Sequence, residues 1–134
     1  MNFTALGATW RPHVLSILRI VAGLLVLQYG LAKLVGWPAV KMFENLPWLS
    51  LFGVAGMFEL VGGTLLVLGL FTQPVAFILS GEMAAAYFIE HFPRGFFPVL
   101  NHGDLAVALC FIFLYLACAG GGPWSLDAVM RGKR

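Results

Sequence analysis

The stretch VLSILRIVAGLLVLQYGLAKLV, residues 14–35, decides the fold class of this chain. It is apolar along most of its length, and only Arg19 and Lys33 carry charge. A helix needs about 20 predominantly apolar residues to cross a bilayer. The stretch therefore predicts a membrane-spanning helix.

Three further apolar stretches follow, and together they predict an all-α membrane protein, a bundle of four transmembrane helices. We place the spans at about residues 14–35, 49–71, 74–91 and 103–120, within a single integral-membrane domain of residues 1–134. The composition agrees, because 60% of the residues are hydrophobic and 10% are charged, whereas a soluble domain has about 25% charged residues. The expected surroundings are a lipid bilayer, and a net charge of +2 does not indicate nucleic-acid binding.

The basic residues predict the orientation of the chain, because short cytoplasmic loops are enriched in Lys and Arg. An even number of spans places both termini on the same side. With the termini in the cytoplasm, four basic residues lie inside (Arg11, Arg131, Lys133 and Arg134) and two lie outside (Lys41 and Arg94). We therefore expect cytoplasmic N- and C-termini.

Six ionisable residues lie inside the spans or at their edges: Arg19, Lys33, Glu59, Glu82, Glu90 and Asp104. A charged side chain at the centre of a membrane helix costs roughly 2.5–3.5 kcal/mol, so these groups should face the interior of the bundle. Helical spacing groups them with small residues, on faces formed by Arg19, Gly23, Val26, Gly30 and Lys33, by Gly53, Gly56, Glu59, Gly62 and Gly63, and by Asp104, Ala108, Phe111, Tyr115 and Cys118. The pattern predicts a polar seam inside the bundle.

Depth along the helices predicts how these groups meet. Arg19 and Glu82 are expected at similar depths, which favours an ion pair between them. Glu59 lies near the middle of the bilayer with no obvious cation at its depth, so it is the best candidate for a neutral, proton-carrying acid. Lys33 is expected near the outer surface, at the level of Glu90, His91, His102 and Asp104.

Several of these residues stand in segments that resemble the DoxX family of membrane proteins. The resemblance covers Ser16–Leu25, Gln28–Leu34, Phe97–Ala106, Phe113–Leu116 and the tail Gly122–Asp127, together with Glu59 before Gly62-Gly63 and Glu82-Met83. Two positions depart from the family pattern: Tyr29 stands where His is common, and Asp104 where Glu is frequent. The first departure removes a group that titrates near neutral pH.

The resemblance implies a four-helix bundle in the bacterial inner membrane and a link to quinone-related redox work. On this basis Glu59 and Glu82 are candidate catalytic groups that carry protons. The candidate ligand-binding residues are Arg19, Lys33, Tyr29, Asp104, His102 and Asn101. The structural alternative is a buried network that fixes helix register, with Asn101 or Asp104 capping the last helix.

No residue pattern predicts a metal, flavin, haem, iron–sulfur or nicotinamide site, so no intrinsic cofactor is expected and quinone is the candidate ligand. Electrons would then come from a soluble or membrane oxidoreductase partner, and whether the chain is itself catalytic stays open. Two other functions stay open as well. One is a non-catalytic membrane scaffold for a soluble oxidoreductase. The other is a small-solute transporter, which would favour a homo-oligomer because four spans are few for a monomeric transporter.

Overall fold

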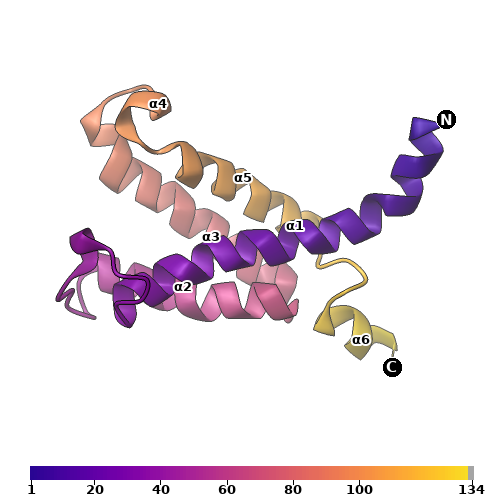
Figure 1. Ribbon diagram of the computed structural model, residues 1–134, viewed down its shortest axis with the longest axis horizontal. Coiled ribbons are helices and arrows are strands. Elements are labelled where there is room, and N and C mark those ends of the chain that lie inside the picture. Colours follow the sequence, from indigo (N-terminus) through magenta and orange to yellow (C-terminus); the bar gives the residue numbers. More distant parts are fainter. Residues whose placement is uncertain (133–134) are drawn as a thin grey trace.

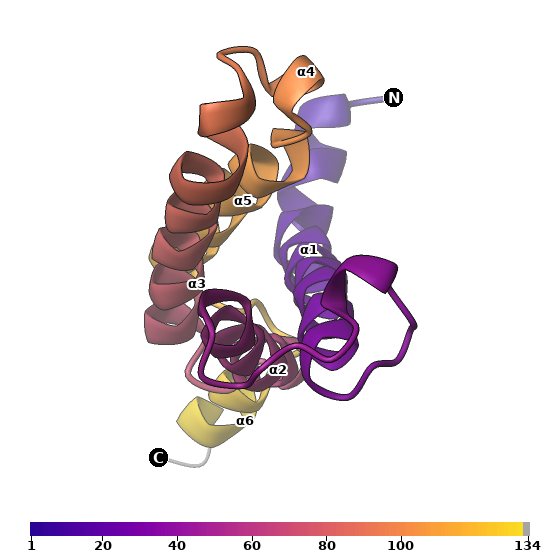
Figure 2. The ribbon, with the colours of Figure 1, turned by 90° about the vertical axis from the view of Figure 1, so that its left-hand side faces the viewer.

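The computed structural model describes residues 1–132, so Lys133 and Arg134, two of the basic residues behind the predicted orientation, lie outside the described residues. Four long helices run side by side: α1 (Phe3–Leu34), α2 (Leu51–Leu68), α3 (Thr72–Ala86) and α5 (Asp104–Ala119). Figure 2 shows the four helices viewed along the longest axis of the molecule. The shorter elements are η1 (Lys41–Phe43), η2 (Tyr87–His91), η3 (Phe92–Arg94), α4 (Pro98–Asn101) and α6 (Leu126–Gly132).

Three helices are long and apolar enough to cross a membrane: Phe3–Leu34, Leu51–Leu68 and the continuous helical segment Thr72–Arg94. The helix Asp104–Ala119 is also apolar but shorter, with 16 residues. The prediction of an all-α protein with membrane helices is confirmed at this level. The first helix starts well before residue 14, because the Asn2 side chain accepts hydrogen bonds from the free N–H groups of Thr4 and Ala5.

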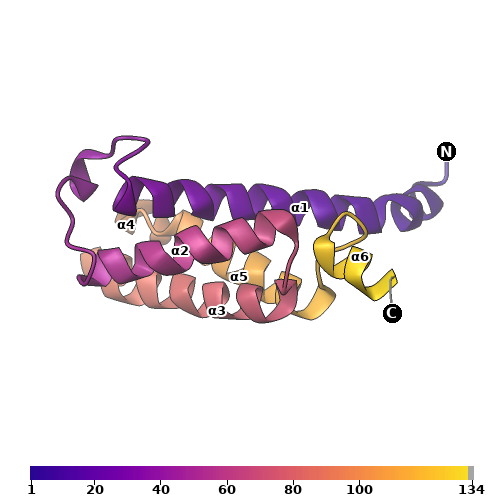
Figure 3. The same ribbon diagram turned by 90° about the horizontal axis from the view of Figure 1, so that it is seen from below.

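The helices pack as two pairs, α1 with α2 and α3 with α5 (Figure 3). Glycines allow the α1–α2 backbones to touch, as small residues do between membrane helices. A Cβ atom on Gly30 would lie 2.5 Å from the backbone N of Leu60, and one on Gly63 would lie 2.8 Å from the backbone N of Leu27. The predicted inward faces of the first two spans are confirmed, since Arg19, the glycines and Glu59 are buried.

Apolar side chains fill the space between the two pairs. Val26 and Leu66 from the first pair meet Leu79, Leu109 and Phe113 from the second. On α5 the buried face consists of Ala106, Leu109, Phe113 and Leu116. This face holds the bundle together and sets the rotation of α5.

The inward face that spacing suggested for the fourth span is wrong. Asp104, Phe111 and Tyr115 all lie on the exposed side of α5. The apolar stripe packs on α3 instead, and Asp104 occupies the first helical turn, where a carboxylate interacts favourably with the helix dipole without being buried.

Candidate functional site

The two helix pairs diverge towards the end of the bundle that carries η1 and α4 (Figure 1). A cavity of about 270 Å³ lies at this end, and residues from α1, η1, α2, α3 and α5 line it. Most of the lining side chains are apolar, among them Val26, Met83 and Leu109. A small number of polar groups in an apolar concavity is typical of a site for a small molecule.

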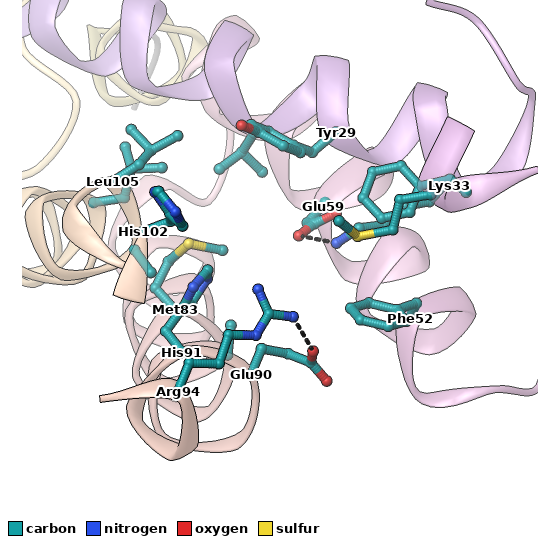
Figure 4. Close-up of a pocket in the computed structure, with 16 residues that line it drawn as sticks. Tyr29, Lys33, Phe52, Glu59, Met83, Glu90, His91, Arg94, His102 and Leu105 are labelled. Atoms are coloured by element: carbon teal, nitrogen blue, oxygen red, sulfur yellow. Dashed lines mark hydrogen bonds and ion pairs between the residues drawn. The ribbon is translucent and has the colours of Figure 1, made fainter. Parts of the chain in front are cut away.

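An ion pair between Lys33 and Glu59 forms one wall of this cavity (Figure 4). The Nζ of Lys33 donates to Oε1 of Glu59 at 2.8 Å, and the two side chains are only 9% and 4% exposed. The ammonium also lies 5.4 Å and 5.8 Å from the ring centres of Phe43 and Phe52. Cation–π contacts of this kind stabilise an ammonium that has little water around it.

A second carboxyl group, that of Glu82 on α3, lies beside this pair. Lys33 and Glu82 both line a further cavity of about 180 Å³, which also reaches Glu90. Among residues 1–132, both carboxyl oxygens of Glu82 and Oε2 of Glu59 are buried without a hydrogen-bond partner. The cluster Lys33–Glu59–Glu82 thus contains one ammonium and two carboxyl groups.

The opposite wall of the cavity carries further polar groups from the end of the Thr72–Arg94 segment. Glu90, His91 and Arg94 line it, with Arg94 Nη2 at 3.8 Å from Glu90 Oε2. The π-helical turn η2 inserts an extra residue into the helix, as such turns often do at functional sites. In Figure 4, His91 and His102 lie across the cavity from Lys33 and Glu59.

The structure brings together four of the residues that the sequence singled out, since Tyr29, Lys33, Glu59 and His102 all line the cavity. Glu90 and His91 line the same cavity, so Lys33 lies at the level of Glu90, His91 and His102, as the sequence predicted. Arg94 and the aromatic rings of Phe43 and Phe52 were missed. Phe43 lies between α1 and α2, where no helical periodicity reveals which side chains turn inward, while Phe52 and Arg94 lie at the ends of helical segments.

Asn101 and Asp104 do not line the cavity. The buried Asn101 amide donates to the Gly95 carbonyl at 2.8 Å and to the Tyr87 hydroxyl at 3.3 Å, and its oxygen accepts from the Gly103 N–H at 2.9 Å. Asn101 therefore fixes the turn before α5. Asp104 is exposed at the start of that helix.

Arg19 lies at the other end of the bundle, and the predicted Arg19–Glu82 pair is wrong. The fully buried guanidinium donates to three carbonyl oxygens: Leu66 at 2.8 Å, Trp124 at 2.6 Å, and Gly121. The reason is the pairing of the helices. Because α1 packs along α2, the guanidinium reaches the Leu66 carbonyl near the end of α2 and the carbonyls of the C-terminal tail.

The expectation that Glu59 has no cation at its depth is also wrong. The stem of Lys33 lies over Gly56, where a Cβ atom would come within 2.9 Å of Lys33 Cβ. Gly56 is one helical turn before Glu59, so the long, flexible side chain extends along α2 and reaches the carboxylate.

The tail that receives Arg19 also fixes the start of α3. Asp127 Oδ1 accepts from the Phe71 N–H at 2.8 Å and Oδ2 from the Thr72 N–H at 2.9 Å. Partial burial alone would raise the pKa of Asp127. The hydrogen bonds from Thr72 and Phe71 outweigh that effect and hold the pKa below its usual value.

The chain matches a known family of proteins and is similar to proteins of two bacteria. The DoxX family model matches residues 14–92. An uncharacterised protein of Haemophilus influenzae is 43% identical over 125 residues, which cover 88% of this chain and 91% of that protein. An uncharacterised membrane protein of Mycobacterium tuberculosis is 32% identical over 147 residues, covering 91% and 83% respectively. No solved structure matches. The apolar helices and these similarities together identify the chain as a multi-pass membrane protein of the DoxX family.

Proposed function

We propose that this protein is a redox-linked, quinone-associated membrane subunit, and that the headgroup of a quinone binds beside Lys33, Glu59 and Glu82. The observation that supports this proposal most is the cluster of one ammonium and two carboxyl groups at the edge of a mainly apolar cavity. Intramembrane ionisable groups usually mark a functional site. A purely structural ion pair would not need the second carboxyl group.

Charge balance suggests what the cluster does. One ammonium neutralises one carboxylate, so the second carboxyl group stays uncharged only while it holds a proton. We infer that Glu59 and Glu82 share this proton and can pass it to a ligand in the cavity.

Quinone chemistry needs such a group. Reduction of a quinone to a quinol takes up two electrons and two protons, and the centre of a bilayer offers few proton donors. Glu59 and Glu82 would pass the two protons to the quinone one after the other. His91 and His102 also line the cavity, on the side from which a new proton would reach the two carboxyl groups. The electrons would come from a soluble or membrane oxidoreductase, which is the partner that the proposal implies.

The proposal includes the membrane arrangement. We place four spans in a single membrane domain by adding α5 to the three longer helices, because α5 runs the length of α3 and packs on it. The site then lies at the outer end of the bundle in the bacterial inner membrane, and both termini lie in the cytoplasm. The sequence has four basic residues on the inner side (Arg11, Arg131, Lys133 and Arg134) against two on the outer side (Lys41 and Arg94), which supports this orientation.

Binding of a short-chain quinone tests the function. The purified protein is placed in lipid nanodiscs and titrated while tryptophan fluorescence is followed, since Trp37 and Trp48 flank the cavity end of the chain. We expect saturable quenching for the wild type and binding at least about tenfold weaker for Glu59→Gln, Glu82→Gln and Lys33→Met. The matched control is Glu44→Gln, the same chemical change at an exposed position outside the cavity. Equal affinity in all five proteins would reject the proposal.

A scaffold for a soluble oxidoreductase is the second candidate, and a group of exposed aromatic rings favours it. Phe88, Phe92, Phe96 and Phe97 contact one another in sequence, with ring centres 5.9, 6.3 and 5.3 Å apart, and each is at least 43% exposed. They lie beside the cavity end of α3. If Phe96→Ser abolishes binding of the oxidoreductase and leaves quinone affinity unchanged, the scaffold function is supported. If Glu82→Gln abolishes binding of the oxidoreductase, the scaffold function is not supported.

A further inference from the structure

Three cavities between the helices adjoin one another, because neighbouring cavities share lining residues. The cavity of about 180 Å³ shares Lys33, Phe52, Ala86 and Glu90 with the polar cavity described above. It shares Val54 and Phe58 with a third, a groove of about 430 Å³ between α2 and α3. The lining of this third cavity, called here the α2–α3 groove, consists of apolar residues and one glycine: Val54, Met57, Phe58, Val61, Gly62, Leu65, Val75, Ile78 and Leu79.

We propose that the α2–α3 groove is a lateral portal, in which the prenyl tail of a quinone lies while its headgroup occupies the cavity beside Lys33. This inference rests on the proposed function and deepens it, because it assigns the tail-binding surface and the route of entry from the bilayer.

The groove has the chemistry of a chain-binding surface. Along α2 it extends from Val54 to Leu65, roughly 16 Å at about 1.5 Å per residue, which is the length of a few prenyl units. Both helices that form it are apolar and long enough to cross a membrane, so the groove opens at the depth of hydrocarbon. Small residues, Ala55 on α2 and Ala85 and Ala86 on α3, line the passage between the groove and the polar cavity.

The charged groups next to the groove, in the cavity of about 180 Å³, favour a quinone over a phospholipid as the occupant. A headgroup that enters from the groove meets Glu82 and Lys33 in the intermediate cavity, and Glu59 lines the polar cavity next to it. A phosphate group there would meet two carboxyl groups, whereas a neutral quinone carbonyl can accept hydrogen bonds from Lys33 or from a protonated carboxyl group. The groove and the cluster therefore suit one molecule that has an uncharged polar head and a branched apolar tail.

The test narrows the passage without touching the polar cavity. Val54 is 39% exposed and lines both the α2–α3 groove and the cavity of about 180 Å³. The substitution Val54→Phe therefore puts a larger side chain between these two cavities. Val21 on α1 is 49% exposed and lines none of the cavities described here, which makes Val21→Phe the matched control. Nanodisc-reconstituted wild type and both variants are titrated with two quinones of identical headgroup, one without a tail and one with three prenyl units.

We expect the tail to strengthen binding equally in the wild type and Val21→Phe, and about tenfold less in Val54→Phe. Partitioning of the longer quinone into lipid is the same for all three proteins, so it cancels from the comparison. An equal gain from the tail in all three proteins would overturn the portal while leaving the headgroup site intact. Absence of binding by the tail-less quinone in all of them would reject the proposed function instead.

Photolabelling separates the two lipid-like occupants. A quinone with a diazirine on its third prenyl unit is expected to label α2 and α3 residues of the groove. A phospholipid with a diazirine on its acyl chain should label all lipid-facing helices alike. Preferential labelling of the groove by the phospholipid, undiminished by added quinone, would overturn the assignment.

Discussion

The two ends of the bundle treat a buried cation in opposite ways. At one end Arg19 donates to three backbone carbonyls, and no cavity is needed to complete its surroundings. At the other end Lys33 has a single carboxylate partner, while three neighbouring carboxyl oxygens have none within the described chain. Because unpaired buried polar atoms are destabilising, the comparison separates a cation whose donors are satisfied by the backbone from a carboxyl cluster that the fold leaves incompletely paired.

The largest expected effect is at Arg19. Arg19→Met removes all three donors and leaves their carbonyl acceptors buried, so we expect a loss of at least about 3 kcal/mol in the free energy of unfolding. Titration with a denaturing detergent, followed by circular dichroism, measures it. Arg19→Lys keeps the charge but lacks the planar fork, and an intermediate loss is expected. An Arg19→Met protein as stable as the wild type would show that this end is not what holds the bundle.

Backbone contact between α1 and α2 should come next. Gly30→Ala puts a methyl group 2.5 Å from the backbone N of Leu60, so the helices must separate, at a cost of about 1–3 kcal/mol. Gly81→Ala on α3 is the control, because a Cβ there meets no atom within 4 Å. That change is expected to be neutral or slightly stabilising, given the higher helix propensity of Ala. Equal losses in the two variants would contradict the close approach.

A smaller effect is expected at Asp127. Asp127→Asn weakens the cap on α3 and should lower stability by about 1 kcal/mol at neutral pH. Because the pKa of Asp127 is lower in the folded state than in the unfolded state, its contribution is complete above the unfolded pKa. It disappears as the pH falls through the folded pKa. Thermal unfolding of wild type and variant between pH 7 and strongly acid pH should therefore converge, and a constant difference would refute this account.

The smallest change in stability is expected at Glu82. This variant gives the clearest contrast between the Lys33–Glu59–Glu82 cluster and Arg19. Glu82→Met removes two buried oxygens that have no partner, so we expect stability to stay the same or rise by about 1 kcal/mol. Quinone binding should nevertheless be lost. Clear destabilisation, with binding retained, would make Glu82 a structural residue.

Hydropathy and glycine spacing were sufficient for much of this architecture. The apolar stretches gave the helices, and the glycines of the first two spans gave the faces that meet, because only small residues allow such close backbones. The fourth span misled, since one acidic residue at the start of a helix says little about the face that is buried farther along. There the apolar stripe of α5, and not its polar residues, decides the packing.

Partners were harder to predict than faces. Helical spacing tells which way a side chain points from its own helix, but the identity of the neighbour depends on how the helices pair. Arg19 was therefore assigned to a carboxylate on α3, although backbone carbonyls, which have no signature in a sequence, were closer. Lys33 reaches Glu59 only because Gly56 leaves room for its stem. Of the candidate site, the polar groups near the outer level were predictable, and the loop residues that enclose them were not.

The contacts of Arg19 also constrain how the chain is made. Two of its three acceptors, the carbonyls of Gly121 and Trp124, lie 102 and 105 residues farther along the chain. During synthesis the first helix must enter the membrane while this guanidinium still lacks both acceptors, and the contacts can form only after Trp124 has left the ribosome. A nascent chain truncated before Gly121 should accordingly leave the Arg19 guanidinium without two of its three acceptors and be more sensitive to proteases than the longer chain.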